Sequence, residues 1–133
     1  MSYLHPELPP IAITRGDMEK LARIADSSAG AFAQTAEFLG REIDRAQVIE
    51  EFESRPGLVK MGSRVTFRDD VTSQVRAVTL VYPGEADVSQ GRISVLTPVG
   101  AALIGLSVSQ SIEWETQSGE RRSLTVLAVD AIV

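Results

Sequence analysis

The side chains of this sequence that could do chemistry are mostly carboxylates. The 133 residues include no cysteine and a single histidine, His5. Without cysteine the chain forms no disulfide and offers no thiolate for catalysis or for a zinc site. A Ser-His-Asp triad would have to use His5, which lies in a proline-rich N-terminal segment and is poorly placed as a catalytic base. The sequence therefore predicts a protein that is not an enzyme, with no catalytic residues, no metal and no cofactor.

Two pairs of carboxylates could bind a metal or transfer protons, but each has a simpler structural interpretation. Glu113 and Glu115 are two residues apart in an expected strand, so both lie on one face while Trp114 lies on the other. We interpret the glutamates as a solvated strand face and Trp114 as core. Asp69 and Asp70 fall in an expected hairpin turn, where aspartate is favoured for local hydrogen bonds.

Two predicted helices position the carboxylates of the N-terminal part. Thr14 resembles a helix N-cap with the acidic Asp17 three residues later, which predicts a first helix over residues 15–26. Turn formers at 27–30 separate it from a second predicted helix over 31–53, on the order of 30 Å long. Helices joined by so short a turn run antiparallel, so a helical hairpin, a short coiled coil, is expected. Its seam follows three- and four-residue spacing through Phe32, Ala36, Leu39, Ile43 and Ala46.

After Pro56 and Gly57 the hydrophobic pattern changes from helical to alternating. Strands are predicted near residues 64–68, 75–82, 92–96, 111–116 and 123–129. Thr97 as N-cap and Pro98 at the first helical position predict one short helix, whose exposed start could dock a partner. The fold class is therefore α+β, with an antiparallel sheet and one short helix. Its three parts are a tail (1–10), a helical hairpin arm (11–55) and the sheet domain (56–133).

The charge of the chain is unevenly distributed. The formal net charge is −5, which argues against autonomous binding to nucleic acid or to an anionic membrane. Residues 1–53 hold five basic and ten acidic groups, whereas residues 54–133 hold eight of each. Glu50, Glu51 and Glu53 are interpreted as a solvated helix face that could contact a basic partner. The sequence thus predicts an acidic arm on a neutral domain, attracted to a basic surface. With no signal peptide and no apolar run long enough to span a bilayer, a cytoplasmic location is expected.

Several short strings in the second part occur in a recognisable order. They are Gly62-Ser63-Arg64-Val65, Leu80-Val81-Tyr82-Pro83, Gly84-Glu85-Ala86-Asp87, Gly91-Arg92-Ile93-Ser94 and the run from Thr97 to Gly105. Together they resemble the C-terminal FKBP-like domain of the bacterial Gre family of transcription elongation factors. Ile112-Glu113-Trp114-Glu115, and the run from Ile43 to Gln47 in the arm, are most similar to the Rnk branch, named as regulators of nucleoside diphosphate kinase.

The resemblance implies binding to RNA polymerase at the mouth of its secondary channel, with nucleic acid contacted only through the polymerase. In Gre factors a Ser-Pro step after the third strand helps to contact the polymerase, and Thr97-Pro98 matches that step. Leu96 stands where Gre factors have an acidic residue. The polymerase-binding segment implied by the resemblance is therefore Leu96, Thr97, Pro98 and Val99.

The tip of the arm distinguishes the branches of the family. Gre cleavage factors have a longer arm whose acidic tip brings a magnesium ion into the polymerase active site. Here the tip consists of Asp26, Ser27 and Ser28, with Asp26 as its lone carboxylate, whereas a divalent cation would require at least two oxygen ligands. The resemblance therefore implies a monomeric regulator that competes with Gre factors at the channel entrance without stimulating transcript cleavage.

Three other hypotheses remain open. The first is a Gre-type elongation factor that stimulates cleavage, with Asp26 supplying the metal ligand. The second is a free prolyl isomerase, which needs an aromatic-lined cleft in a chain that is only 5% aromatic. The third is a self-associating module that uses Phe38, Val48 or Phe52.

Overall fold

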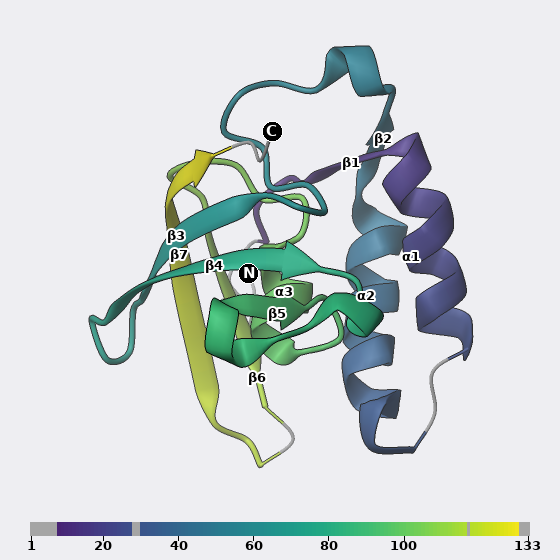
Figure 1. Cartoon of the computed structure of the whole chain (residues 1–133). Helices are drawn as coiled ribbons and strands as arrows, with labels where there is room; N and C mark the ends of the chain where they lie inside the picture. The colour runs from purple at the N-terminus through teal and green to yellow at the C-terminus, as the bar shows by residue number, and fades with distance from the viewer. Residues whose placement is uncertain (1–7, 28–29, 117, 131–133) are drawn as a thin grey trace, which may run out of the picture.

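A mixed five-stranded sheet with a pair of helices along one side makes up the part of the chain that the computed structural model describes, residues 8–27, 30–116 and 118–130 (Figure 1). The helices are α1 (Arg15–Ser27), α2 (Ala33–Arg45) and the short α3 (Pro98–Leu103). The strands are β1 (Ala12–Thr14), β2 (Gln47–Ile49), β3 (Arg64–Asp69), β4 (Val75–Val81), β5 (Arg92–Ser94), β6 (Ser111–Glu115) and β7 (Arg121–Asp130). The α+β class predicted from the sequence is confirmed.

The two long helices form the antiparallel hairpin that the apolar spacing predicts (Figure 1). Helix α1 begins where expected, because the Asp17 N–H donates to Thr14 Oγ1 at 3.4 Å and Thr14 thus caps the helix. Leu21 on α1 is fully buried, as is Leu39 on α2. Each helix has 13 residues and is about 20 Å long.

The second helix is shorter than the sequence predicts, because α2 ends at Arg45 and does not reach Glu53. Ala46 is extended, and β2 pairs in parallel with β1 as a separate two-stranded sheet. Two of the three β2 residues are β-branched, a residue type that favours strand pairing over helix. The expected helix of about 30 Å is therefore wrong.

The glutamates expected on the last turns of that helix lie instead at a 3₁₀ turn after β2. A carboxylate oxygen of Glu50 is 2.8 Å from the Arg15 guanidinium, and one of Glu51 is 3.0 Å from Lys60 Nζ. These exposed charges are thus paired within the chain, joining the end of the hairpin to its neighbours.

The five-stranded sheet has the order β5-β4-β3-β7-β6. Three of its four pairings are antiparallel, but β5 runs parallel to β4, so the prediction of a wholly antiparallel sheet is wrong at this pair. Two 3₁₀ turns, Pro83–Glu85 and Val88–Gln90, return the chain to the middle of β4, where Arg92 pairs with Thr79, and β5 then runs in the same direction as β4. Strand β6 forms one edge of the sheet.

One apolar core joins the helical hairpin to the sheet. Leu21 and Leu39 from the hairpin belong to the same cluster as Leu80 on β4, Leu103 on α3 and Leu124 on β7. The hairpin therefore lies along the sheet, and the end of α1 is at the same end of the molecule as the start of β7 (Figure 1). Among the described residues no helix is long and apolar enough to cross a membrane.

Candidate functional site

The segment before α3 is held by a compact set of hydrogen bonds. Thr97 Oγ1 accepts from the Gly100 N–H at 3.0 Å, which caps the helix, and donates to the Ser94 carbonyl at 2.7 Å. The Leu96 N–H donates to Ser94 Oγ at 2.9 Å. A Cβ at position 100 would lie 2.2 Å from the Ser94 carbonyl oxygen, so the turn accepts only glycine there. The predicted capping role of Thr97 is confirmed.

The four residues of the expected docking segment differ in exposure. Pro98 is exposed, and Thr97 and Val99 are half-buried, so these three contribute to one surface at the start of α3. Leu96 is only 8% exposed and belongs to the core. It supports the segment from beneath and has little surface of its own to offer a partner.

The hairpin tip presents few charged groups. Asp26 and Ser27 are exposed at the end of α1, and Ser28 lies outside the described residues. Ser27 Oγ donates to the Ile24 carbonyl at 3.5 Å. Across residues 8–27, 30–116 and 118–130, no group of three or more His, Cys, Asp or Glu side chains is arranged to hold a metal.

A contact between α1 and the sheet was not predicted from the sequence. The sequence predicts only a role for Asp17 at the start of the helix. In the structure one of its carboxylate oxygens accepts from the Met61 N–H and the other from the Tyr82 hydroxyl, both at 3.2 Å. Burial and the neighbouring Asp17 raise the pKa of Tyr82 well above its ordinary value. Lys20 Nζ lies 5.7 Å from the centre of the Tyr82 ring. The contacts fix α1 against the sheet.

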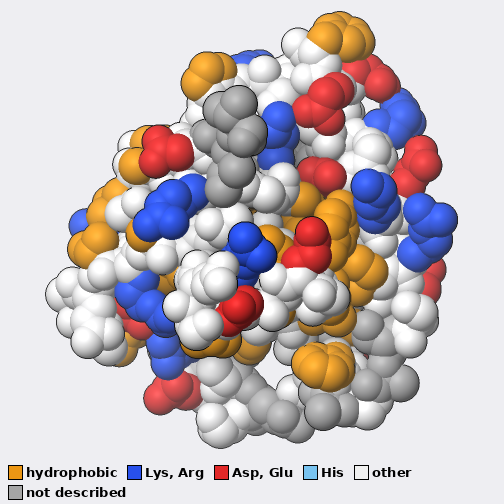
Figure 2. Space-filling view, in the orientation of Figure 1, with side chains coloured by type: hydrophobic (Ala, Val, Ile, Leu, Met, Phe, Trp, Pro, Cys, Tyr) orange, Lys and Arg blue, Asp and Glu red, His pale blue; other side chains and the backbone are white. Residues whose placement is uncertain are grey.

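Asp17, Met61 and Tyr82 line a hollow between α1 and the end of β4. Lys20, Glu85 and Arg92 stand around it together with Tyr82. Figure 2 shows apolar side chains near the centre of this face, bordered by side chains of both charges. A nucleic-acid surface would carry a basic stripe, which this face does not have.

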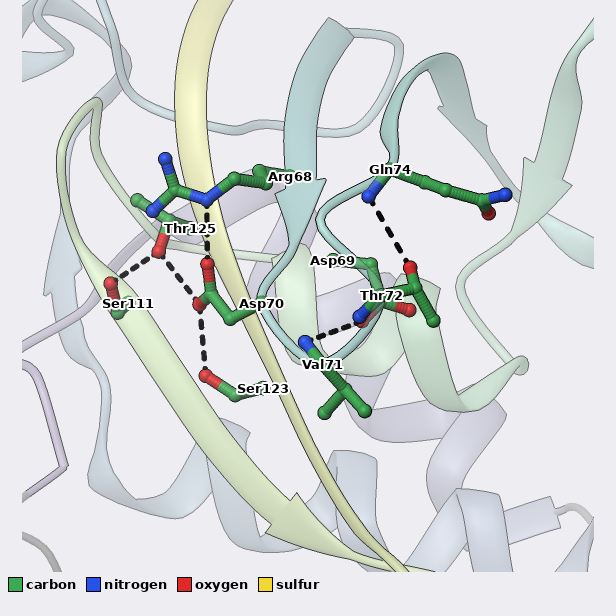
Figure 3. Close-up of polar contacts among 9 residues, drawn as sticks. All are labelled: Arg68, Asp69, Asp70, Val71, Thr72, Gln74, Ser111, Ser123 and Thr125. Atoms are coloured by element: carbon green, nitrogen blue, oxygen red, sulfur yellow. Dashed lines mark hydrogen bonds and ion pairs between the residues drawn. The ribbon is translucent and has the colours of Figure 1, made fainter.

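The turn between β3 and β4 confirms the structural interpretation of its two aspartates (Figure 3). Asp69 accepts from the backbone N–H groups of Val71 and Thr72, at 2.9 and 3.2 Å, and from the Arg122 guanidinium at 2.8 Å. Desolvation opposes ionisation of Asp69, but these donors together hold its pKa below the ordinary value.

Asp70 in the same turn links β3 to β7 (Figure 3). Its carboxylate accepts from Arg68 Nε at 2.8 Å, Ser123 Oγ at 2.9 Å and Thr125 Oγ1 at 2.8 Å. Desolvation is again outweighed by these hydrogen bonds, so the pKa of Asp70 is also lowered. The carboxylates of Asp69 and Asp70 therefore stabilise the β3–β4 turn and its contact with β7.

Sequence reasoning also missed a groove between α2 and β6. The rings of Phe38 on α2 and Trp114 on β6 are stacked, with centroids 6.3 Å apart and an angle of 27° between planes. Glu113 and Glu115 are exposed and Trp114 is half-buried, which confirms the alternation predicted for this strand. Pro98 stands at the border of the groove. The sequence signal for this groove was Phe38, an apolar residue of the predicted helix that lies outside its seam.

Comparison with known proteins gives a consistent relationship. A family model described as "Transcription elongation factor, GreA/GreB, C-term" matches residues 54–131, and one described as "Rnk N-terminus" matches residues 9–49. The "Regulator of nucleoside diphosphate kinase" of Escherichia coli strain K12 is 40% identical over 122 residues, which are 92% of this chain and 90% of that protein. "Transcription elongation factor GreA" of Roseiflexus castenholzii is 42% identical over 85 residues, 64% of this chain and 54% of that protein.

A solved structure supports the same relationship for the whole described fold. The "Prokaryotic transcription elongation factor GreA/GreB from Nitrosomonas europaea" has a TM-score of 0.70 and 34% sequence identity, covering 91% of this chain and 98% of that one. The two family models together span both the helical hairpin and the sheet. The chain therefore belongs to the Gre/Rnk family of transcription factors and is most similar to its Rnk branch.

Proposed function

We propose that this protein regulates transcription by docking on RNA polymerase at the entrance of the secondary channel. The observation that supports the proposal most directly is the exposed turn at the start of α3. There Pro98 is presented to solvent while Thr97 and Gly100 fix the backbone beneath it. A docking residue held by a rigid turn loses little conformational entropy on binding. Leu96, Thr97, Pro98 and Val99 are thus the proposed polymerase-binding segment.

We propose further that docking does not stimulate transcript cleavage. The 13-residue helices are about 20 Å long and lie along the sheet, which limits how far the tip reaches from the docking segment. Asp26 is the last carboxylate before the turn, and one carboxylate supplies too few oxygens to hold a divalent cation beside a substrate. A protein that occupies the docking site of Gre factors without their metal-bearing tip would compete with them.

The test is a competition experiment with backtracked elongation complexes. Added alone, the protein should leave the RNA intact; added in excess, it should suppress cleavage stimulated by a Gre factor. A Pro98→Glu variant should lose the suppression, because a charge replaces an exposed apolar contact at a helix position that accepts glutamate. Val71→Glu makes a matched change in the β3–β4 turn, where Val71 is 63% exposed, and should compete like the wild type. Persistent Gre activity at saturating protein would refute the proposal.

The alternative is a factor that itself stimulates cleavage. The exposed position of Asp26 at the end of α1 is the observation that favours it. In the same assay this alternative predicts RNA shortening by the protein alone, abolished by Asp26→Ala. If Asp26→Ala and wild type behave alike and neither shortens the RNA, the alternative is excluded.

A further inference from the structure

The groove between α2 and β6 combines an apolar floor with a strand edge. Phe38 and Trp114 stack across it, and Ile112 is buried beside them. Arg41 covers the outer side of the Phe38 ring, with its guanidinium 5.9 Å from the ring centre. Trp114 and Phe38 therefore offer aromatic surface from two different elements, one a helix and the other a strand.

Within the described residues, no strand pairs with the outer edge of β6, which forms one side of the groove. β6 is the last strand in the order β5-β4-β3-β7-β6 and pairs with β7 on its inner side. The Thr116 N–H donates to the Glu120 carbonyl at 2.8 Å, across the β6–β7 ladder. Because inward- and outward-directed residues alternate along an antiparallel strand, the peptide groups of Glu113 and Glu115 point away from β7. Both residues border the groove.

The floor of the groove also contains an unused donor. Trp114 Nε1 is buried and has no hydrogen-bond acceptor among the residues that the structure describes. A buried N–H without an acceptor is costly and rare in folded proteins. A carbonyl group of a ligand would reach this N–H only where the atoms that bury it move aside.

The charges around the groove favour a basic ligand. Four glutamates and one arginine line it, but Glu42 is buried and paired with Arg45 at 2.7 Å and Glu37 is paired with Arg41 at 3.4 Å, so the acidic charge open to a ligand is that of Glu113 and Glu115. Glu113 is 3.7 Å from Arg121, a long ion pair, and within the described residues Glu115 has none. Two copies of β6 paired edge to edge would bring these glutamates together, which disfavours self-association through this edge.

We propose that this groove binds an extended, basic segment of a partner protein, which adds to the edge of β6 as a further strand. Side chains alternate between the two faces of a strand, so lysine or arginine on one face of the segment would meet Glu113 and Glu115. Apolar side chains on its other face would contact Trp114 and Phe38. The inference goes beyond polymerase docking and does not depend on it.

The fluorescence of Trp114 provides the test, because it is the only tryptophan of the chain. The probe is a short, terminally blocked peptide of alternating lysine and valine, titrated into the full chain without polymerase. We expect the Trp114 emission to change, with a Kd of about 10 to 100 µM. A peptide of alternating glutamate and valine should give no response. A lysine-valine peptide with a central proline should give none either, because proline lacks the N–H that the strand edge requires.

Variants of the chain separate this groove from general charge attraction. Glu113→Gln with Glu115→Gln should weaken the lysine-valine peptide by about tenfold. Glu19→Gln with Glu85→Gln removes two glutamates that do not line the groove, and should leave the Kd unchanged. Raising the salt from about 0.05 to 0.5 M should weaken binding to the wild type more than to the groove variant.

Four results would overturn the proposal. One is no Trp114 response to the lysine-valine peptide up to about 1 mM. Another is equal affinity of the two double variants. The third is binding only after removal of residues 1–7. Leu8 lines the groove, so this result would mean that the chain's own N-terminal segment occupies the groove. Sedimentation that showed a dimer dissociated by the peptide would instead assign the β6 edge to a second copy. All four measurements leave the competition test with polymerase unaffected.

Discussion

Replacing Gly100 with alanine tests how the turn before α3, the proposed docking turn, is built. In an open helix a glycine-to-alanine change is stabilising by roughly 0.5–1 kcal/mol, because alanine restricts the unfolded chain more. At Gly100 the added Cβ would lie 2.2 Å from the Ser94 carbonyl oxygen and 2.9 Å from Thr97 Oγ1. Both neighbours are fixed, since that carbonyl accepts hydrogen bonds from the Thr97 N–H and hydroxyl at 3.1 and 2.7 Å.

The expected cost has two parts. Forcing a methyl group into a filled space costs about 1–3 kcal/mol, and losing one of the Ser94 hydrogen bonds adds about 1 kcal/mol. The helix-propensity gain of about 1 kcal/mol offsets part of this, so Gly100→Ala should lower the free energy of unfolding by about 2 kcal/mol. At about 4 °C per kcal/mol for a chain of this length, Tm should fall by about 8 °C.

Gly40 supplies a matched control in the same protein. It lies inside α2, and nothing stands within 4 Å of an added Cβ. Gly40→Ala should therefore raise the free energy of unfolding by roughly 0.5–1 kcal/mol. Urea unfolding followed by circular dichroism measures both variants. If Gly100→Ala were as stable as Gly40→Ala, the close approach to Ser94 would not determine the turn. The Gly100→Ala variant should also compete more weakly for polymerase, because the start of α3 must move.

Three further predictions concern polar contacts. The lowered pKa of Asp70 means that its ionised form stabilises the fold above about pH 4 and that this contribution is lost as the pH falls through the folded-state pKa. Acid-unfolding curves of wild type and Asp70→Asn should therefore converge at low pH, and a constant difference would contradict the role given to its donors. Glu42 is buried and bonded to Arg45 at 2.7 Å, so Glu42→Gln should cost about 2 kcal/mol in urea unfolding, while an unchanged midpoint would show the pair to be neutral. Tyr82→Phe removes the hydroxyl that donates to Asp17 and should cost about 1 kcal/mol; a Tm equal to that of the wild type would count against this link.

Local signals predicted most of the elements. The N-caps at Thr14 and Thr97 are hydrogen bonds over three residues, and such short-range chemistry is visible in a sequence. The end of α2 was missed because it depends on pairing between β2 and β1, which are more than thirty residues apart. Helical periodicity through residue 49 could not reveal that competition.

For the candidate sites too, the sequence predicted what depends on local signals and missed what depends on long-range packing. The Thr97-Pro98 pattern predicted the exposed position of Pro98 at the start of α3, because a capped proline is a local signal. It did not reveal that Leu96 is part of the core, which depends on where the sheet curves. The groove was missed for a similar reason. Phe38 and Trp114 are 76 positions apart and meet only when the hairpin packs on the sheet.

Strand β1 constrains the order in which the protein assembles. The Ala12 N–H donates to the Gly105 carbonyl at 3.2 Å, and the Met61 N–H donates to Asp17 on α1. During synthesis the hairpin leaves the ribosome long before Gly105 exists, so these partners are absent while α1 and α2 first form. A hairpin of two 13-residue helices is marginal by itself in water. The hairpin thus acquires its final orientation late, when the C-terminal strands close the core, and the proposed docking segment takes its final position relative to Asp26 in the same step.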